Sequence, residues 1–230
     1  MKILSLLYPE RCPVCDAVIP FGKQGFCKKC AKEPVIIKEP VCMKCGRPLE
    51  KKKEYCEDCE GTKRNFDGGR FAFSYATVSA GVYRFKYMNR RAYAQTYAKA
   101  IKDELYDWIM ATKAKALIPV PLHKKRLIAR GYNQSKILAD EISALTGIPV
   151  ADKCVERVQN TAPQKLFNRK QRLINVKKAF IVRENVVKLD TVIIVDDIFT
   201  TGSTIDSLAG VLKESGVKKV FFLTVTAAGT

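Results

Sequence analysis

The run VIIVDDIFTTGST at residues 192–204 holds the side chains best suited to chemistry. Four apolar β-formers lead into Asp196 and Asp197, which predicts a buried parallel strand with two carboxylates at its end. The polar segment 200–204 adds hydroxyls, a glycine for close approach and the free N–H groups of a helix N-terminus, and this combination favours an anion. Carboxylates accept hydrogen bonds from vicinal sugar hydroxyls or from waters on a metal ion. We therefore expect a site for a ribose 5-phosphate.

Other loop types fit this run less well. A Walker loop needs a lysine before its Ser or Thr, a dinucleotide fold needs the glycines of GxGxxG, and the run has neither. The structural alternative is an ordinary strand, turn and helix, with Thr201 or Ser203 as the helix cap. Two consecutive acids at a buried strand end are costly without a ligand, and this cost favours the binding site.

Eight of the nine cysteines form four CxxC pairs within the first 59 residues. A CxxC pair places two thiolates on one edge of a tetrahedron, so two pairs complete a closed structural Zn²⁺ site. Four pairs predict two zinc ions held by sequential pairs, with interleaved pairing as the alternative. Disulfides and a thioredoxin-like redox pair are the competing uses, and the lack of a secretory signal favours metal. The predicted ligands are Cys12, Cys15, Cys27, Cys30, Cys42, Cys45, Cys56 and Cys59.

The cysteine-bearing segment also divides the chain. It is small and rich in Lys, Pro and Gly, so metal binding would supply the folding free energy that apolar burial cannot. We expect an N-terminal zinc-binding module, a double zinc ribbon, over residues 1–62 and a second domain over residues 63–230. Cys154 stands apart among apolar neighbours and is expected to be a small buried hydrophobe.

The formal net charge of the 230-residue chain is +18, and most of the surplus follows the cysteine segment. Residues 1–66 carry 14 basic and 9 acidic side chains, which leaves 27 and 14 for the remainder. Such a field attracts polyanions, and a solvated basic surface without a partner is the alternative. No apolar run approaches the ~20 residues of a membrane span, and residues 3–7 are too short for a signal segment, so we expect a cytoplasmic protein.

The second domain alternates between strand-like and helix-like patterns. Strands are expected at residues 71–75, 116–120, 150–158, 192–195 and 217–226. Helices are expected at residues 78–88, 92–109 and 135–145, and from Ser203 onward. Strands separated by helices predict an α/β fold with a doubly wound, mainly parallel sheet, in which the last strand closes the sheet and the site lies at the strand carboxyl ends.

The 192–204 run resembles the phosphoribosyl pyrophosphate (PRPP) signature of type I phosphoribosyltransferases. Together with the CxxC pairs, PVPLH at residues 119–123, RGYNQ at residues 130–134 and the basic segment 157–175, it makes the chain similar to the ComF (ComFC) family along essentially its full length. The resemblance implies a type I phosphoribosyltransferase fold and Mg²⁺ bound with PRPP. It also implies a role in natural transformation or in handling incoming single-stranded DNA, and association with a ComFA-type helicase.

The resemblance assigns residues as well. Asp196 and Asp197 would bind the ribose hydroxyls, and the 5-phosphate would lie on Thr200, Thr201, Gly202, Ser203 and Thr204. The place of the pyrophosphate loop is taken by Pro119, Val120, Pro121, Leu122, Lys124, Lys125 and Arg126. Mg²⁺ would bridge pyrophosphate and ribose oxygens mostly through water. His123 stays open between protonating a leaving group and simple packing, so no catalytic residue is assigned.

The polar connection at residues 159–175 is longer than the ~12–15 residues that ordinary loops reach. By the same resemblance it is a flexible hood that folds over the bound sugar and excludes water. A mobile basic loop without a catalytic role is the alternative. The hood residues would be Arg157, Thr161, Gln164, Arg169 and Arg172.

Two functions stay open from the sequence. The first is an enzyme that transfers the phosphoribosyl group of Mg²⁺·PRPP to an acceptor, which the sequence does not name, and releases pyrophosphate. The second is a non-catalytic module that keeps PRPP as a regulatory ligand and binds single-stranded DNA and a helicase. Aromatic side chains interleaved with Lys and Arg can stack bases, although aromatics at helical spacing more often form core. The aromatic side chains concerned are Tyr83, Phe85, Tyr87, Tyr93 and Tyr97.

Overall fold

A parallel sheet forms the centre of the fold, as seen in a computed structural model that describes residues 9–20, 23, 25–32, 34–50, 53–158, 179–183 and 188–230. Within these ranges the sheet has four strands in the order β1-β6-β5-β2, and every neighbouring pair is parallel. The strands are β1 (Gly68–Ser74), β2 (Ala116–Pro119), β5 (Thr191–Phe199) and β6 (Lys219–Ala227).

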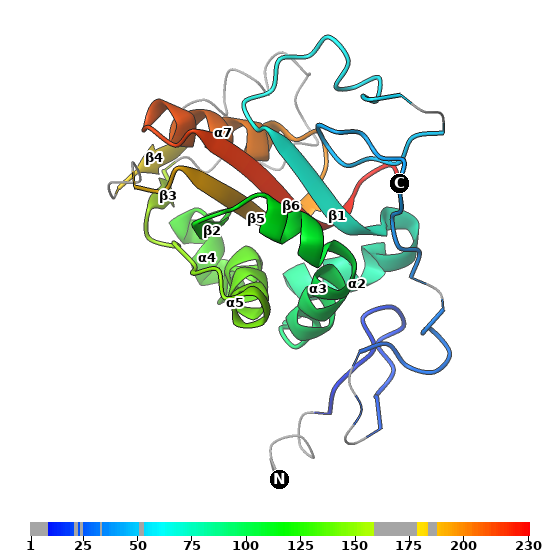
Figure 1. The fold of residues 1–230 in the computed structure, drawn as a ribbon. Helices are drawn as coiled ribbons and strands as arrows, with labels where there is room; N and C mark the ends of the chain where they lie inside the picture. Colours follow the sequence, from blue (N-terminus) through cyan, green and yellow to red (C-terminus); the bar gives the residue numbers. More distant parts are fainter. Residues whose placement is uncertain are drawn as a thin grey trace.

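Helices cover both faces of this sheet (Figure 1). One face carries α2 (Tyr75–Tyr87), α3 (Tyr93–Ala111) and α5 (Gln134–Thr146), and the other carries α7 (Ser203–Glu214). Successive side chains of a strand point to opposite faces, so Ile193 and Val195 of β5 pack with the first group while Val192 and Ile194 pack with α7. The prediction of a doubly wound parallel α/β fold is confirmed.

Three predicted details of this fold are wrong. The strand expected at residues 150–158 is reduced to β3 (Val155–Arg157), which pairs antiparallel with β4 (Phe180–Val182) in a separate sheet. Val150 makes one isolated bridge to Leu117, and the polar residues after it do not continue the ladder. The strand expected to close the sheet, β6, lies inside it because its apolar run pairs on both sides. The helix α4 (Lys124–Arg130) was not expected, since it buries no residue and so shows no apolar stripe.

The described residues of the two cysteine segments, which fall within 9–32 and 41–61, lie against different parts of this domain (Figure 1). The first contacts α2, where a Cβ at Gly81 would lie 1.9 Å from the carbonyl oxygen of Pro13. The second contacts β1, where a Cβ at Gly46 would lie 2.6 Å from the carbonyl oxygen of Gly69. Glycine is required at both positions because the backbones approach so closely. Within the described ranges, every helix is too short or too polar to cross a membrane.

Candidate functional site

A cavity of about 190 Å³ opens beyond the carboxyl ends of β2 and β5. Its lining brings together predicted site residues from separate segments: Val120, Leu122, Arg126, Arg157, Asp196, Asp197, Thr200 and Thr204. Residues that sequence reasoning did not assign to the site also line it: Lys86, Tyr87, Arg130, Gln134 and Ile198. Other predicted residues are adjacent in the chain but do not line it: Pro119, Pro121, Lys124, Lys125, Thr201, Gly202 and Ser203.

A buried ion pair joins α2 to β5 at the floor of the cavity. The Nζ atom of Lys86 lies 2.7 Å from Oδ2 of Asp197, whose side chain is only 1% exposed. Burial alone would lower the pKa of Lys86, but the charges of Asp197 and Asp196 outweigh burial and raise it. Lys86 is therefore a fixed cation at the site.

Asp196 is the carboxylate whose ionised form its surroundings disfavour. Its Oδ1 accepts hydrogen bonds from Ser135 Oγ at 2.7 Å and from the backbone N–H of Asp197 at 2.9 Å. Burial, and then the charge of Asp197, raise the pKa of Asp196 to about 7, while Lys86 and Ser135 oppose that rise. Above about pH 7, where Asp196 is ionised, the pair holds more negative charge than Lys86 neutralises, and its oxygen atoms are the hard ligands that Mg²⁺ prefers.

The start of α5 positions the Ser135 hydroxyl. Asn133 caps this helix, because its Oδ1 accepts from the Ser135 backbone N–H at 3.0 Å. The same side chain donates through Nδ2 to the carbonyl oxygen of Val120 at 3.1 Å, which ties the helix start to the end of β2. Gln134 accepts a hydrogen bond from Arg130. The hydrogen bonds of the RGYNQ run thus hold α4, α5 and the end of β2 together beside the cavity.

The predicted phosphate loop turns between β5 and α7. Gly202 has a φ of 76°, and a Cβ there would lie 2.6 Å from the ring of Phe199, so only glycine fits. Gly202 is also the helix cap, and no side chain caps α7. The prediction that Thr201 or Ser203 could be the cap is therefore wrong, since the Thr201 hydroxyl lies 3.1 Å from that of Ser203 instead. No side chain caps the first turn of α7, and its one acid, Asp206, accepts hydrogen bonds from Asn65, so the N–H groups of this turn can face an anion.

The predicted pyrophosphate segment continues into α4. Arg126 and Arg130 lie one helical turn apart and both line the cavity, so α4 presents two guanidinium groups to it. The Nζ atom of Lys124 lies 3.6 Å from Oε1 of Glu156. The Nδ1 atom of His123 accepts from the backbone N–H of Lys125 at 3.3 Å and caps the helix. His123 therefore makes a capping hydrogen bond in the structure, and its role in protonating a leaving group stays a prediction.

Arg157 is the one predicted hood residue within the described ranges, and it lies at the end of β3. Its guanidinium carbon lies 5.5 Å from the centroid of the Phe180 ring, and its side chain lines the cavity. Burial, and then the nearby charge of Arg126, lower the pKa of Arg157, so two guanidinium groups crowd one end of the cavity. The other predicted hood residues lie outside the described residues: Thr161, Gln164, Arg169 and Arg172.

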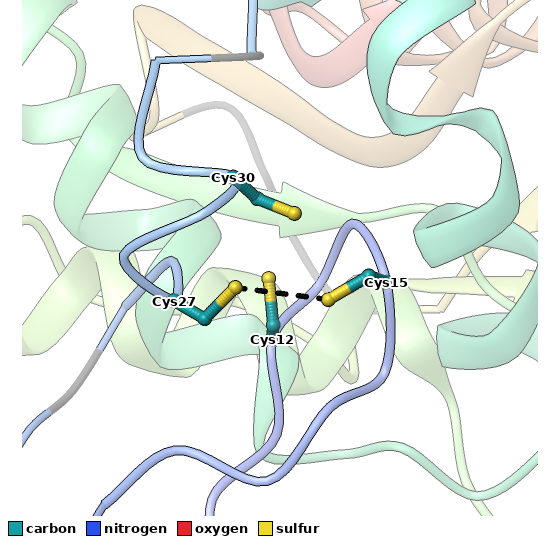
Figure 2. Close-up of side chains that lie close together, drawn as sticks. All are labelled: Cys12, Cys15, Cys27 and Cys30. Atoms are coloured by element: carbon teal, nitrogen blue, oxygen red, sulfur yellow. Dashed lines mark hydrogen bonds between the residues drawn. The ribbon is translucent and has the colours of Figure 1, made fainter.

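The eight paired cysteines form two clusters, and Figure 2 shows the first with its sulfur atoms gathered together. The pairing is sequential, as predicted, and the interleaved alternative is wrong: one cluster holds Cys12, Cys15, Cys27 and Cys30, and the other Cys42, Cys45, Cys56 and Cys59. The sulfur atoms of each cluster lie within 4.8 Å of one another. Tetrahedral zinc with ~2.3 Å bonds needs sulfur atoms about 3.8 Å apart. The clusters therefore fit two structural Zn²⁺ ions.

Each cluster includes a thiol that ionises readily. Hydrogen bonds lower the pKa of Cys27 to about 7, with the backbone N–H of Cys30 as the largest cause. The hydrogen bond with Cys45 is the largest cause that lowers the pKa of Cys59 to about 6. Metal binding requires thiolates, so these thiols favour it. Cys154 is buried and donates to the carbonyl oxygen of Ala151 at 3.0 Å, as expected for a structural cysteine.

Comparisons with known proteins agree with both parts of the chain. The family model described as "Double zinc ribbon domain" matches residues 3–60. Competence protein F of Haemophilus influenzae is 32% identical over 216 residues, covering 91% of this chain and 93% of that protein. DNA utilization protein YhgH of Salmonella typhimurium is 28% identical and covers 94% of this chain and 96% of that protein. Competence protein ComFC of Bacillus subtilis is 26% identical, with coverages of 84% and 80%.

A solved structure is also similar in part. Purine phosphoribosyltransferase from Pyrococcus horikoshii aligns with a TM-score of 0.34 at 15% identity. The alignment covers 57% of this chain and 80% of that one. The fold described above stands on the strand order and on the helices that cover both faces of the sheet.

The raised pKa of Asp196 predicts how the free energy of unfolding depends on pH. In the folded state this pKa is about 7 against an ordinary 3.8, so the folded protein binds more protons between these values and its stability falls as pH rises through that window. Asp196→Asn removes this titration, so its gain in the free energy of unfolding over wild type should be larger at pH 8 than at pH 5 by about 2–3 kcal/mol, because the folded carboxyl is neutral at pH 5 while the unfolded one is ionised at both pH values. Urea unfolding at both pH values measures this.

Asp140→Asn is the matched control, because Asp140 is a carboxylate on α5 that pairs with Lys136 near solvent. It should give no gain at pH 8. Equal losses of stability at both pH values for Asp196→Asn would contradict the raised pKa.

Metal removal should expose the cysteines as a group. The purified, reduced protein is expected to hold two zinc ions per chain, one for each cluster. Because small ribbons depend on metal for folding, a strong chelator should release the zinc and make eight thiols reactive under native conditions, with buried Cys154 reacting last. Zinc assay and thiol titration measure this. Protein that is fully folded and metal-free would contradict the zinc assignment.

Proposed function

The chain belongs to the competence protein F family, and from this membership we propose that its cavity binds PRPP together with Mg²⁺. The observation that carries the proposal is the meeting, in one cavity, of two carboxylates and a helix start that no side chain caps. PRPP has a phosphate at one end of its ribose and a pyrophosphate at the other. Asp196 and Asp197 would accept the ribose hydroxyls between these ends, directly or through waters on Mg²⁺.

The two anionic ends of PRPP would have different partners. The 5-phosphate would lie on the N–H groups at the start of α7, with the hydroxyls of Thr200 and Thr204 beside it. The pyrophosphate would lie between the guanidinium groups of Arg126, Arg130 and Arg157, which suit phosphate oxygens because they donate in pairs. An anion there would relieve the crowding that lowers the pKa of Arg157.

Phosphoribosyl transfer would follow from the same arrangement. The bond between C1 and the pyrophosphate oxygen breaks, the pyrophosphate keeps the electron pair, and a nucleophile on the acceptor forms the new bond to C1. Arg126 and Arg130 would stabilise the departing charge, so the contribution of the protein is electrostatic. His123 is given no part in this step, because it does not line the cavity.

The names of the relatives point to the process in which this site acts. They are called competence protein F, competence protein ComFC and DNA utilization protein. We propose that this chain likewise serves DNA uptake and natural transformation from the cytoplasmic side, beside a helicase of the ComFA type. Its zinc ribbons keep cysteines as thiolates, which fits a reducing compartment.

A specific observation favours single-stranded DNA binding as a second candidate function. Of the five aromatic side chains interleaved with basic ones, Phe85, Tyr93 and Tyr97 are buried, which fits core packing. Tyr83 and Tyr87 are exposed on α2, with ring centroids 5.0 Å apart. The guanidinium of Arg130 lies 5.1 Å from the Tyr87 centroid, and both residues line the cavity. An aromatic ring and a cation at a cavity mouth could stack a base and hold its phosphate.

PRPP binding can be tested by calorimetry. The wild-type protein should bind PRPP in the presence of Mg²⁺, and Asp196→Asn with Asp197→Asn should remove that binding, because the ribose and the metal lose their acceptors. Below pH 7 the affinity should fall as Asp196 takes up a proton, since its pKa is about 7. Wild-type protein that does not bind PRPP at pH 8 would contradict the proposal.

DNA binding can be tested with a labelled oligonucleotide. Tyr87→Ala should weaken binding about tenfold, since stacking contributes ~1–3 kcal/mol per base, and affinity should fall steeply with salt. Tyr106→Ala is the control, because Tyr106 is an exposed tyrosine of α3 that does not line the cavity. Equal effects of the two substitutions would contradict a stacking site at the cavity mouth.

A further inference from the structure

The second cysteine segment contacts the phosphate loop directly through Arg47. Its Nη2 atom donates to the carbonyl oxygen of Thr200 at 3.0 Å and to that of Ala228 at 3.2 Å. The Nη1 atom pairs with Oδ2 of Asp58 at 2.8 Å. The guanidinium also lies 6.0 Å from the ring of Phe199, the ring that packs on Gly202. One arginine therefore touches the strand end, the loop and the chain that follows β6.

Residues of the second cysteine cluster position both Arg47 and its partner Asp58. The backbone carbonyl of Arg47 accepts from the N–H of Cys42 at 2.7 Å, within the first CxxC turn of that cluster. Asp58 lies inside the second CxxC turn, between Cys56 and Cys59. The position of the guanidinium thus depends on the fold that the four thiolates take around their metal.

The chain leaving this cluster makes a second connection to the loop. Arg64 donates to the carbonyl oxygen of Thr201 at 3.4 Å. The backbone N–H of Asn65 donates to Oδ1 of Asp206, in the first turn of α7, at 2.6 Å. The loop is therefore held at its carbonyl oxygens and at the helix that follows it.

The first cysteine segment makes its contacts elsewhere. Asp16 pairs with Arg90 at 2.8 Å and accepts from the Tyr93 hydroxyl at 2.5 Å, and Arg84 donates to the carbonyl of Val14. Among the contacts described, those that the first segment makes with the second domain are to α2, to Arg90 in the connection after it, to the start of α3 and, through Phe26, to Phe73 of β1; none is to the phosphate loop. The two clusters are thus not equivalent.

We propose that Arg47, supported by Arg64, is a positioning residue for the phosphate loop and makes the geometry of that loop depend on the metal-bound second cluster. A trans peptide is planar, so its N–H points opposite to its C=O. Holding the carbonyl of Thr200 fixes the N–H of Thr201, and holding the carbonyl of Thr201 fixes the N–H of Gly202. The two arginines thereby aim successive loop amides. That these amides receive a phosphate rests on the proposed function.

Hydrogen exchange of the loop amides, measured without PRPP, tests the proposal. Arg47→Ala should speed exchange across residues 199–204 about tenfold, and Arg47→Lys should do nearly the same. An ammonium keeps the charge but cannot hold two carbonyls and a carboxylate as the planar guanidinium does. The control is Lys44→Ala, which removes a cation of the same segment that makes no contact with the loop. Wild-type exchange in Arg47→Lys would overturn the proposal.

A double-mutant cycle tests the dependence on the cluster. Cys56→Ser should remove zinc from the second cluster, speed loop exchange and weaken PRPP binding about tenfold, while Cys15→Ser, in the first cluster, should leave loop exchange unchanged. If the second cluster acts through Arg47, Cys56→Ser should add little in an Arg47→Ala background. Additive effects, or an equal effect of Cys15→Ser, would overturn the proposal. Zinc content of each variant identifies any that lose both ions.

PRPP binding and loop hydrogen exchange, measured together, distinguish a failure of the positioning role from a failure of PRPP binding. Wild-type protein that does not bind PRPP, combined with faster loop exchange in both Arg47 variants, would reject PRPP binding and support the positioning role. PRPP binding that is equally tight in wild type, Arg47→Ala and Arg47→Lys, with zinc retained, would support the proposed function and overturn the positioning role.

Discussion

The buried ion pair between Lys86 and Asp197 is the constraint on which the site depends. It fixes the end of α2 against the end of β5, and it leaves Asp196 as the charge that Lys86 does not neutralise. Removing one partner from such a pair costs about 3–5 kcal/mol, because the other charge stays buried. Two adjacent acids at a strand end are tolerated here since a lysine lies beside one and a serine donates to the other. Above about pH 7, where Asp196 is ionised, the pair carries one negative charge that Lys86 does not neutralise.

The two cysteine segments contact two different elements that line the cavity, α2 and the loop after β5. The first contacts α2, where Pro13 packs on Gly81 and Arg84 donates to Val14, two residues before Lys86. The second holds the loop after β5 through Arg47. Small metal-bound modules are rigid for their size, because the metal supplies their folding free energy. Metal in the two clusters would thus hold both Lys86 and the loop after β5 in place around one carboxylate pair.

Local patterns predicted what depends on nearby residues. The 192–204 run and the CxxC spacing each act over a few positions, so the strand, the carboxylates and the two clusters were found from sequence. Lys86 was not found as a site residue, because the aromatic and basic composition of its helix resembles a nucleic-acid-binding face. Only the packing of the helix turns Lys86 toward the site. Arg47 reaches a loop 153 residues away, and no periodicity marks such a contact. The central place of β6 likewise depends on pairing between distant segments.

A crystal structure of the protein with Mg²⁺ and PRPP would show whether the cavity binds PRPP in the proposed orientation. The ribose hydroxyls should lie on Asp196 and Asp197, directly or through the water shell of Mg²⁺, while Lys86 keeps its place beside Asp197. The 5-phosphate should lie on the N–H groups at the start of α7. PRPP bound outside this cavity, or bound with its phosphate away from residues 200–204, would contradict PRPP binding at this site.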